Sequence, residues 1–274
     1  LMCHYRHQAH SDVLLWPGLQ DITAHVDFTA IAEAGPDSPF VAETLITAGV
    51  LRLYALDFDT CRELMEQLLV VSQRVRIENC GIGYSHHLIG MVAYEQNRLD
   101  EAEACFGRLD ALRYTVPTRL YQDALLGRAL VAIARNDPEL AKHCCSRAHA
   151  YAIETGDPTS LYISRSFELR LKLVRDSRSI VFGEPPRADD HQTFWLEVPT
   201  ATWAKHLIAH PDPEKRAAAP GFIDDAIGRM QQSHNERQVF TLEVLRSVAL
   251  DQSGEREAAL EALAGLVSRG AEHG

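Results

Sequence analysis

The sequence predicts an all-α fold built from stacked antiparallel helix pairs, and three observations support this prediction. First, the segment 90–106 has the pattern of two paired helices. Gly90 is a small residue inside the first helix and Asn97 lies in the turn. In the second helix, Ala102 lies one helical turn before Phe106. Second, this pattern recurs about every 40 residues. Third, no segment alternates apolar and polar residues convincingly enough to be a strand. Repetition of this kind favours binding and regulation over catalysis.

The pattern keeps its register over three helix pairs. Its four positions, Gly90, Leu99, Ala102 and Phe106, are matched about 41 residues upstream by Gly49, Phe58, Cys61 and Met65, and about 39 residues downstream by Ala129, Pro138, Ala141 and Cys145. Near the end of the chain, the segment 254–260 repeats the turn and the alanine. We therefore expect roughly six helix pairs, some of them degenerate.

Four prolines mark the beginnings of helices. Each follows a residue whose side-chain oxygen can cap a helix, and a proline loses nothing at the first helical position, where its missing N–H would have no partner. These sites are Ser38-Pro39, Asp137-Pro138, Asp157-Pro158 and Asp212-Pro213. We predict helices at 20–34, 39–55, 58–76, 80–96, 99–113, 117–135, 138–154, 158–175, 192–209, 214–233, 236–252 and 255–269, and an irregular loop near 176–191.

Composition predicts a soluble helical protein, with 46% hydrophobic and 24% charged residues. The sequence has neither an apolar run long enough to span a bilayer nor a signal-peptide pattern, so we expect a cytoplasmic protein without a membrane partner. The net charge of −11 argues against direct contact with nucleic acid, because phosphate contacts need clustered Lys and Arg. Because the sequence begins at Leu1 in mid-pattern, we expect residues 1–274 to be a single helical-repeat solenoid excised from a longer multidomain protein.

Common catalytic motifs are missing from the sequence. It contains no Gly-Lys-Ser/Thr phosphate loop, no Gly-x-Ser-x-Gly elbow and no His-Glu-x-x-His. The groups that could bind a metal include Cys3 with His4, His7 and His10, and the pair His206 and His210. The first would need three helical turns to be gathered, and the second fits exposed histidines at a helix end better. We predict no enzyme activity, no cofactor and no metal site, and small buried thiols in place of disulfides.

The first helix of each pair is expected to line a concave surface. If Gly90 faces the second helix of its pair, helical geometry turns the opposite side of its own helix toward that surface. On the helix of Gly90 this rule predicts ligand or partner binding by Tyr84, His87, Tyr94 and Glu95, and at equivalent positions of the other pairs by Asp123, Tyr162, Arg165, Lys172 and Glu197. Tyrosine, basic and acidic side chains together suit a polar ligand such as a sugar, or a peptide. The alternative is that they form ordinary solvated surface.

Several sequence segments resemble a known protein family. They are residues 90–103, the junction 154–158, the segment 194–205 and the ending 254–258. From about residue 38 onward the chain resembles the tetratricopeptide-like region of MalT-type regulators of the LuxR family. This resemblance implies a right-handed superhelical solenoid placed between a nucleotide-binding ATPase domain and a helix-turn-helix domain. It also implies a part in binding the inducer, which is a sugar in the maltose regulator.

The resulting expectation is a sensor module in transcription regulation. Such a module binds a small-molecule inducer or a regulatory protein on its superhelix and controls the activation of its parent. Its intramolecular partners are the ATPase and helix-turn-helix domains, and ATP is implied only for that missing ATPase domain. The alternative is a passive protein-protein docking scaffold of another multidomain signalling protein.

Overall fold

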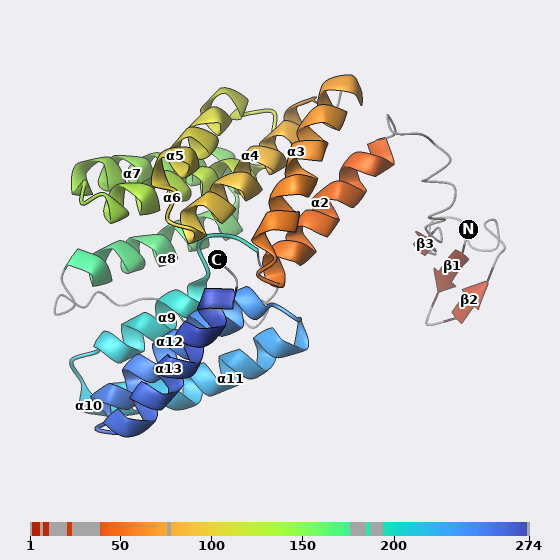
Figure 1. The fold of residues 1–274 in the computed structure, drawn as a ribbon. Helices are drawn as coiled ribbons and strands as arrows, with labels where there is room; N and C mark the ends of the chain where they lie inside the picture. The colour runs from red at the N-terminus through yellow and green to blue at the C-terminus, as the bar shows by residue number, and fades with distance from the viewer. Residues whose placement is uncertain are drawn as a thin grey trace.

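The computed structural model describes residues 2–5, 8–10, 21–23, 39–75, 78–175, 185–186 and 194–272. From Pro39 onward, the described chain is helical apart from short connections, and this confirms the all-α prediction for that part (Figure 1). The helices are α2 (Pro39–Tyr54), α3 (Phe58–Val75), α4 (Glu78–Glu95), α5 (Leu99–Arg108), the 3-10 helix η1 (Leu109–Leu112), α6 (Thr118–Ala134), α7 (Pro138–Thr155), α8 (Pro158–Arg175), α9 (Pro199–Ala209), α10 (Pro213–Ala217), α11 (Ala219–Gln232), α12 (Glu236–Gln252) and α13 (Arg256–Glu272).

Three short strands precede the helices. The strands β1 (Met2–Tyr5), β2 (Gln8–His10) and β3 (Asp21–Thr23) form an antiparallel sheet in the order β2-β1-β3. The prediction of a helix over 20–34 is therefore wrong at β3, and 24–34 lies outside the described residues. Pairing with a distant partner strand, which local periodicity does not reveal, determines this structure.

The turns between helices repeat the same geometry. Asn97 ends the first helix of its pair in the left-handed region, with φ of 55°, and Asn136 does the same one repeat later, with φ of 56°. The next N–H then donates to a carbonyl five residues back, as from Arg98 to Ala93 at 2.7 Å. This motif satisfies carbonyl groups that a helix end leaves open. Equivalent bonds begin at Asp57, Asp137, Asn235 and Glu255.

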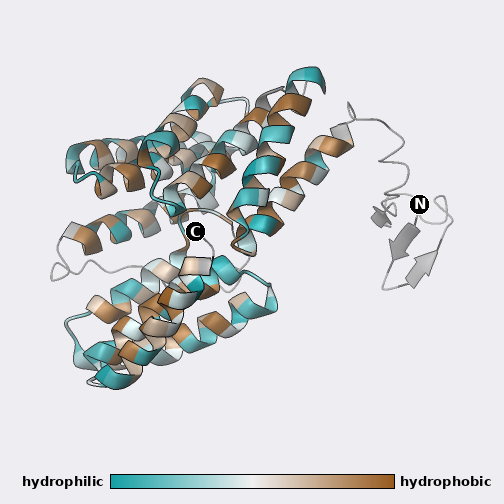
Figure 2. Cartoon of the chain, in the orientation of Figure 1, coloured by the Kyte–Doolittle hydropathy of each residue, from teal (hydrophilic) through white to brown (hydrophobic). Residues whose placement is uncertain are grey.

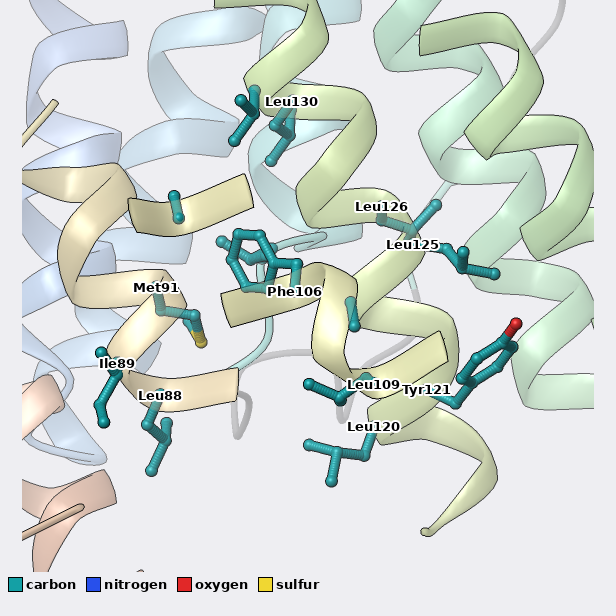
Figure 3. Packing of buried hydrophobic residues seen from close by; sticks show 14 of the residues in the cluster. Leu88, Ile89, Met91, Phe106, Leu109, Leu120, Tyr121, Leu125, Leu126 and Leu130 are labelled. Carbon is teal, nitrogen blue, oxygen red and sulfur yellow. The ribbon is translucent and has the colours of Figure 1, made fainter. Parts of the chain in front are cut away.

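Small residues bring paired helices together, as the sequence predicts. A Cβ atom at Gly90 would lie 2.7 Å from the Phe106 ring, and one at Gly49 would lie 2.4 Å from Cε of Met65. Figure 3 shows Phe106 between the helix that carries Met91 and the helix that carries Leu126. The predicted partners Gly90–Phe106 and Gly49–Met65 are thereby confirmed.

Buried apolar residues form two clusters along the chain. The first core is formed mainly by α2–α8 and contains the aromatic residues Phe106, Tyr121 and Phe167. The second core is formed by α9, α11 and α12 and consists largely of alanine and branched aliphatic residues. Both groups of helices carry mixed apolar and polar faces in Figure 2, which fits helices that are buried on one side. No helix in the described part of the chain is long and apolar enough to cross a membrane.

Three further predicted helices differ from the structure. The helix predicted over 192–209 begins at Pro199, whose ring suits the first helical position. The helix predicted over 214–233 is divided at Ala218 into α10 and α11, and Pro220 stands in the first turn of α11. The helix predicted over 99–113 tightens after Arg108 into η1. Residues 176–184 and 187–191 of the predicted loop lie outside the described part.

Candidate functional site

A short non-helical segment, residues 194–198, connects the first core to the second. Asp123 of α6 holds its backbone: the N–H of Leu196 donates to Oδ2 at 2.9 Å, and the N–H of Glu197 donates to Oδ1 at 3.5 Å. His87 of α4 places its Nε2 2.8 Å from the same Oδ2. The His87 and Asp123 side chains are both 0% exposed. A buried carboxylate is stable only when its lone pairs are satisfied in this way.

The surroundings of Asp123 favour its ionised form. Burial acts to raise the pKa of Asp123, but the hydrogen bond with His87 and the charge of Arg119 outweigh it, so the pKa lies below its ordinary value. The Arg119 guanidinium lies 3.5 Å from Oδ1 and stacks 5.1 Å from the ring centre of Trp195. The His87 ring meets Trp195 edge-on at 5.7 Å. Asp123 is therefore a charged, covered anchor for the segment 194–198.

Glu197 forms the second buried carboxylate. Its Oε1 accepts from Ser166 at 2.6 Å and from Thr202 at 2.7 Å, and its Oε2 accepts from Arg170 at 3.2 Å. Ser166 and Arg170 belong to α8, whereas Thr202 belongs to α9, so Glu197 links the two cores. We call His87, Asp123 and Glu197, with their donors, the buried carboxylate cluster.

The structure thus brings together three of the predicted binding residues, His87, Asp123 and Glu197, but not on an open surface. All three are 0% exposed, and the segment 194–198 covers the side of α4 and α6 on which the first two lie. Their hydrogen-bonding atoms already have partners within the chain, apart from Nδ1 of His87. Stabilisation of the fold is the role that this geometry supports for them.

A polar cavity of about 220 Å³ lies beside the buried carboxylate cluster. It opens between α4 and α8 on the side of the first core and α9 and α12 on the side of the second, so we call it the junction cavity. Its polar lining residues are Tyr94, Glu95, Arg170, Thr202, Lys205, Arg237, Gln238 and Thr241.

Positive groups outnumber negative ones around the junction cavity. Arg237 pairs with Glu95, with 2.8 Å between Nε and Oε1, and Arg170 pairs with Glu197 of the cluster. Within the described part of the chain, the half-buried Lys205 makes neither an ion pair nor a hydrogen bond, and Glu197 acts on its charge only at longer range. Burial and the charge of Arg170 lower the pKa of Lys205 to about 8, against a smaller opposing effect of Glu197. One lysine therefore remains without a counter-ion in a confined space.

Gln238 contributes a second unsatisfied group. The residue is 3% exposed, and its Oε1 has no hydrogen-bond partner in the part of the chain that the structure describes. An amide oxygen buried without a partner costs about 1–3 kcal/mol. Across the cavity, burial raises the pKa of Tyr94, so its hydroxyl is neutral and can donate. A hydrogen-bond acceptor (Gln238), a donor (Tyr94) and a cation (Lys205) therefore line the same small cavity.

The remaining predicted residues are divided between separate places. Tyr94 and Glu95 line the junction cavity, and the Tyr84 ring lies 6.5 Å from that of Phe194. On α8, Tyr162 is buried, and Arg165 and Lys172 are exposed. Lys172 lines a different cavity, of about 600 Å³, whose walls include Pro138, Ala141, Leu171 and Val174 of α7 and α8.

Sequence reasoning did not identify four residues of the junction cavity: Arg170, Lys205, Arg237 and Gln238. Lys205 does leave a signal, because it is the single Lys or Arg in α9, which is otherwise apolar or weakly polar. Arg237 and Gln238 give none, since polar residues are ordinary in the first turn of a helix such as α12. Their role depends on the packing of α12 against α9.

The histidine pair of α9 differs from its expected placement. His206 and His210 are buried, with 4% and 8% exposure, whereas exposed positions at a helix end were expected. Their rings lie 5.3 Å apart, and burial and the charge of His210 lower the pKa of His206. In the part of the chain that the structure describes, no three His, Cys, Asp or Glu side chains are grouped to hold a metal.

Comparison with known protein families gives a match at the beginning of the chain. A family model described as a putative S-adenosyl-L-methionine-dependent methyltransferase matches residues 1–43. This match covers less than half of the chain and includes none of the residues that line the junction cavity. No curated protein and no solved structure matches the chain.

Proposed function

We propose that the helical region is the sensor module of a larger regulatory protein and that its ligand binds in the junction cavity. The observation that supports this proposal is that two polar groups line the cavity between the two cores: the buried Oε1 of Gln238, which has no hydrogen-bond partner among the described residues, and the half-buried Lys205, which forms no ion pair with them. Native proteins rarely leave such groups unsatisfied, and binding sites are where they do. This function requires no catalysis, cofactor or metal in the segment, and we place it in the cytoplasm.

The position of the cavity supports a regulatory mechanism. A ligand in it would touch α4 and α8 on one side and α9 and α12 on the other, so its affinity would depend on how the two cores are arranged. Any such ligand shifts the population toward the arrangement that it binds best. The right-handed, tetratricopeptide-like superhelix that we propose would transmit this shift along the chain.

For the parent protein, we propose a MalT-like regulator of the LuxR family, on the resemblance of the segments 90–103 and 194–205. In such a parent the module would act on an ATPase domain and a helix-turn-helix domain and would not touch nucleic acid itself. A regulatory protein could replace the small molecule as the effector.

A passive docking scaffold is the second candidate function, and one observation favours it. The cavity between α6, α7 and α8 has about 600 Å³ and a largely apolar wall that includes Ala141, Leu171 and Val174. A wall of this kind suits an apolar side chain of a partner peptide.

A thermal-shift screen tests the sensor proposal, because a ligand that binds only the folded state raises the melting temperature. The chain would be screened against amino acids, hydroxy acids, sugars and nucleosides. We expect a saturable shift that Tyr94→Phe or Gln238→Leu weakens and that Gln252→Leu, at an exposed position of α12, leaves unchanged. A folded chain that responds to none of these compounds would contradict the proposal and favour the docking scaffold.

A further inference from the structure

We propose that the junction cavity binds a small carboxylate that also carries an N–H or O–H donor, such as an amino acid or a hydroxy acid. This inference rests on the proposed sensor function and specifies the ligand. It follows from three properties of the cavity: its charge, its unsatisfied amide and its size.

The charge of the cavity calls for one negative group. Of its three cations, Arg237 has Glu95 as a partner and Arg170 has Glu197, which leaves the ammonium group of Lys205 unbalanced. A half-buried charge without an adjacent counter-ion is poorly stabilised, and an entering carboxylate would give it a charge-assisted hydrogen bond. A neutral sugar would not.

The amide of Gln238 calls for a donor on the same ligand. Its buried Oε1 accepts no hydrogen bond from the residues that the structure describes, so a ligand N–H or O–H gains the bond and removes an existing penalty. The hydroxyl group of Tyr94 also lines the cavity and can turn toward a polar ligand, whereas those of Thr202 and Thr241 already donate to Glu197 and to the carbonyl of Arg237. A carboxylate without a donor would leave Gln238 unsatisfied.

The size of the cavity excludes large ligands. Its volume of about 220 Å³ lies below the range of roughly 300–1,000 Å³ that is usual for drug-sized ligands. An oligosaccharide, the inducer that the family resemblance suggests, would not fit inside it. The ligand class is therefore a molecule of amino-acid dimensions.

Calorimetric titration of the whole chain tests this inference with matched probes. L-Serine, L-alanine and L-lactate each carry a carboxylate and an N–H or O–H donor. Acetate carries a carboxylate but no donor, and ethylamine carries a donor but no carboxylate. Glycerol is uncharged and has no carboxylate. We expect saturable binding by at least one of the first three and at least about tenfold weaker binding by the others. Lys205→Met should weaken binding at least about tenfold, whereas Lys215→Met, at an exposed lysine of α10, should not.

The Gln238→Leu variant tests the donor requirement separately from the carboxylate requirement. It should abolish the preference for serine, alanine or lactate over acetate while binding of the carboxylate persists. Circular dichroism melting of each variant shows that it is folded.

The pH provides an independent readout. Because the pKa of Lys205 is about 8, binding of the carboxylate should weaken as the pH rises above that value, and Lys205→Met should remove this dependence. The other charged or titratable groups that face Lys205 are Tyr94, Glu95, Arg170, Glu197 and Arg237.

Two results would overturn the inference, and they have different meanings. If glycerol or a sugar bound as tightly as serine, and Lys205→Met did not change the affinity, the proposed ligand class would be wrong. The proposed sensor function would not be contradicted by that result. If folded protein bound none of these probes and none of the compounds in the wider thermal screen, both would fail.

Discussion

The buried carboxylate cluster and the junction cavity are neighbours, but the carboxylates of the cluster have hydrogen-bond partners, whereas two polar groups of the cavity have none in the described part of the chain. In the cluster, Asp123 and Glu197 have both of their carboxylate oxygens bonded within the chain. In the cavity, Oε1 of Gln238 is buried without such a partner among the described residues, and Lys205 forms no ion pair with them. Satisfied polar groups specify how the segment 194–198 is attached, whereas unsatisfied ones are costly in the free protein. The contrast separates residues that build the fold from residues that can bind a ligand.

The largest effect is expected from breaking the cluster with Asp123→Ala. This change leaves the N–H of Leu196 and the His87 ring without their acceptor inside the core. The free energy of unfolding should fall by about 3–5 kcal/mol, measured by chemical denaturation. Asp100→Ala is the matched control, because the Asp100 side chain is fully exposed, and it should change stability by less than about 0.5 kcal/mol. Equal losses in the two variants would show that the cluster does not stabilise the fold.

A smaller loss is expected from Thr202→Val. The variant keeps the shape of the side chain and removes one of the donors to Oε1 of Glu197, while Ser166 still donates to the same oxygen. We expect a loss of about 1–2 kcal/mol in denaturant unfolding. Thr241→Val, in the cavity wall, should cost less, because the Thr241 hydroxyl bonds only a carbonyl of its own helix. The reverse order would contradict the division between cluster and cavity.

An effect of opposite sign is expected from Gln238→Leu in the ligand-free chain. Because the amide oxygen is buried without a partner, leucine removes a penalty, and stability should rise by up to about 1–2 kcal/mol. Thermal unfolding would measure the change against Gln252→Leu, which we expect to be nearly neutral. A marked loss of stability in Gln238→Leu would show that the amide already has a partner.

A further effect is a pH dependence due to Lys205. Its folded-state pKa of about 8 lies below the ordinary value of 10.5, so the unfolded chain binds a proton more readily between these two values. The contribution of Lys205 to stability should therefore rise as the pH increases from about 8 to 10.5 and be constant below that range. Subtracting the profile of Lys205→Met isolates it. Parallel profiles for the two proteins would contradict the confined position of this lysine.

Much of the fold can be predicted from local sequence signals. Pro138 and Pro158 begin helices at the predicted residues, and the helix predicted over 236–252 has the bounds found for α12. The partners of Gly49 and Gly90 were also predictable, because they follow from helical spacing and the repeat. These features depend on residues that are close in sequence or one repeat apart.

The candidate site depends on contacts that local patterns do not contain. The segment 194–198 was predicted as helix, and it is non-helical where its backbone donates to Asp123, more than seventy residues earlier in the chain. Rotation about the helix axis predicted that Tyr94 and Glu95 lie on a binding face, and both line the junction cavity. The same rule could not show that the segment 194–198 covers His87 and Asp123, since this covering follows from tertiary packing.

The most direct test of the central contrast is to compare the melting temperatures of Asp123→Asn and Gln238→Leu in the ligand-free chain. Both changes remove one polar function and nearly conserve volume. The account predicts opposite signs: Asp123→Asn lowers the melting temperature because it weakens a satisfied anchor, and Gln238→Leu raises it because it removes an unsatisfied group. A fall in both, or a rise in both, would contradict the assignment of the cluster to the fold and of the cavity to a ligand.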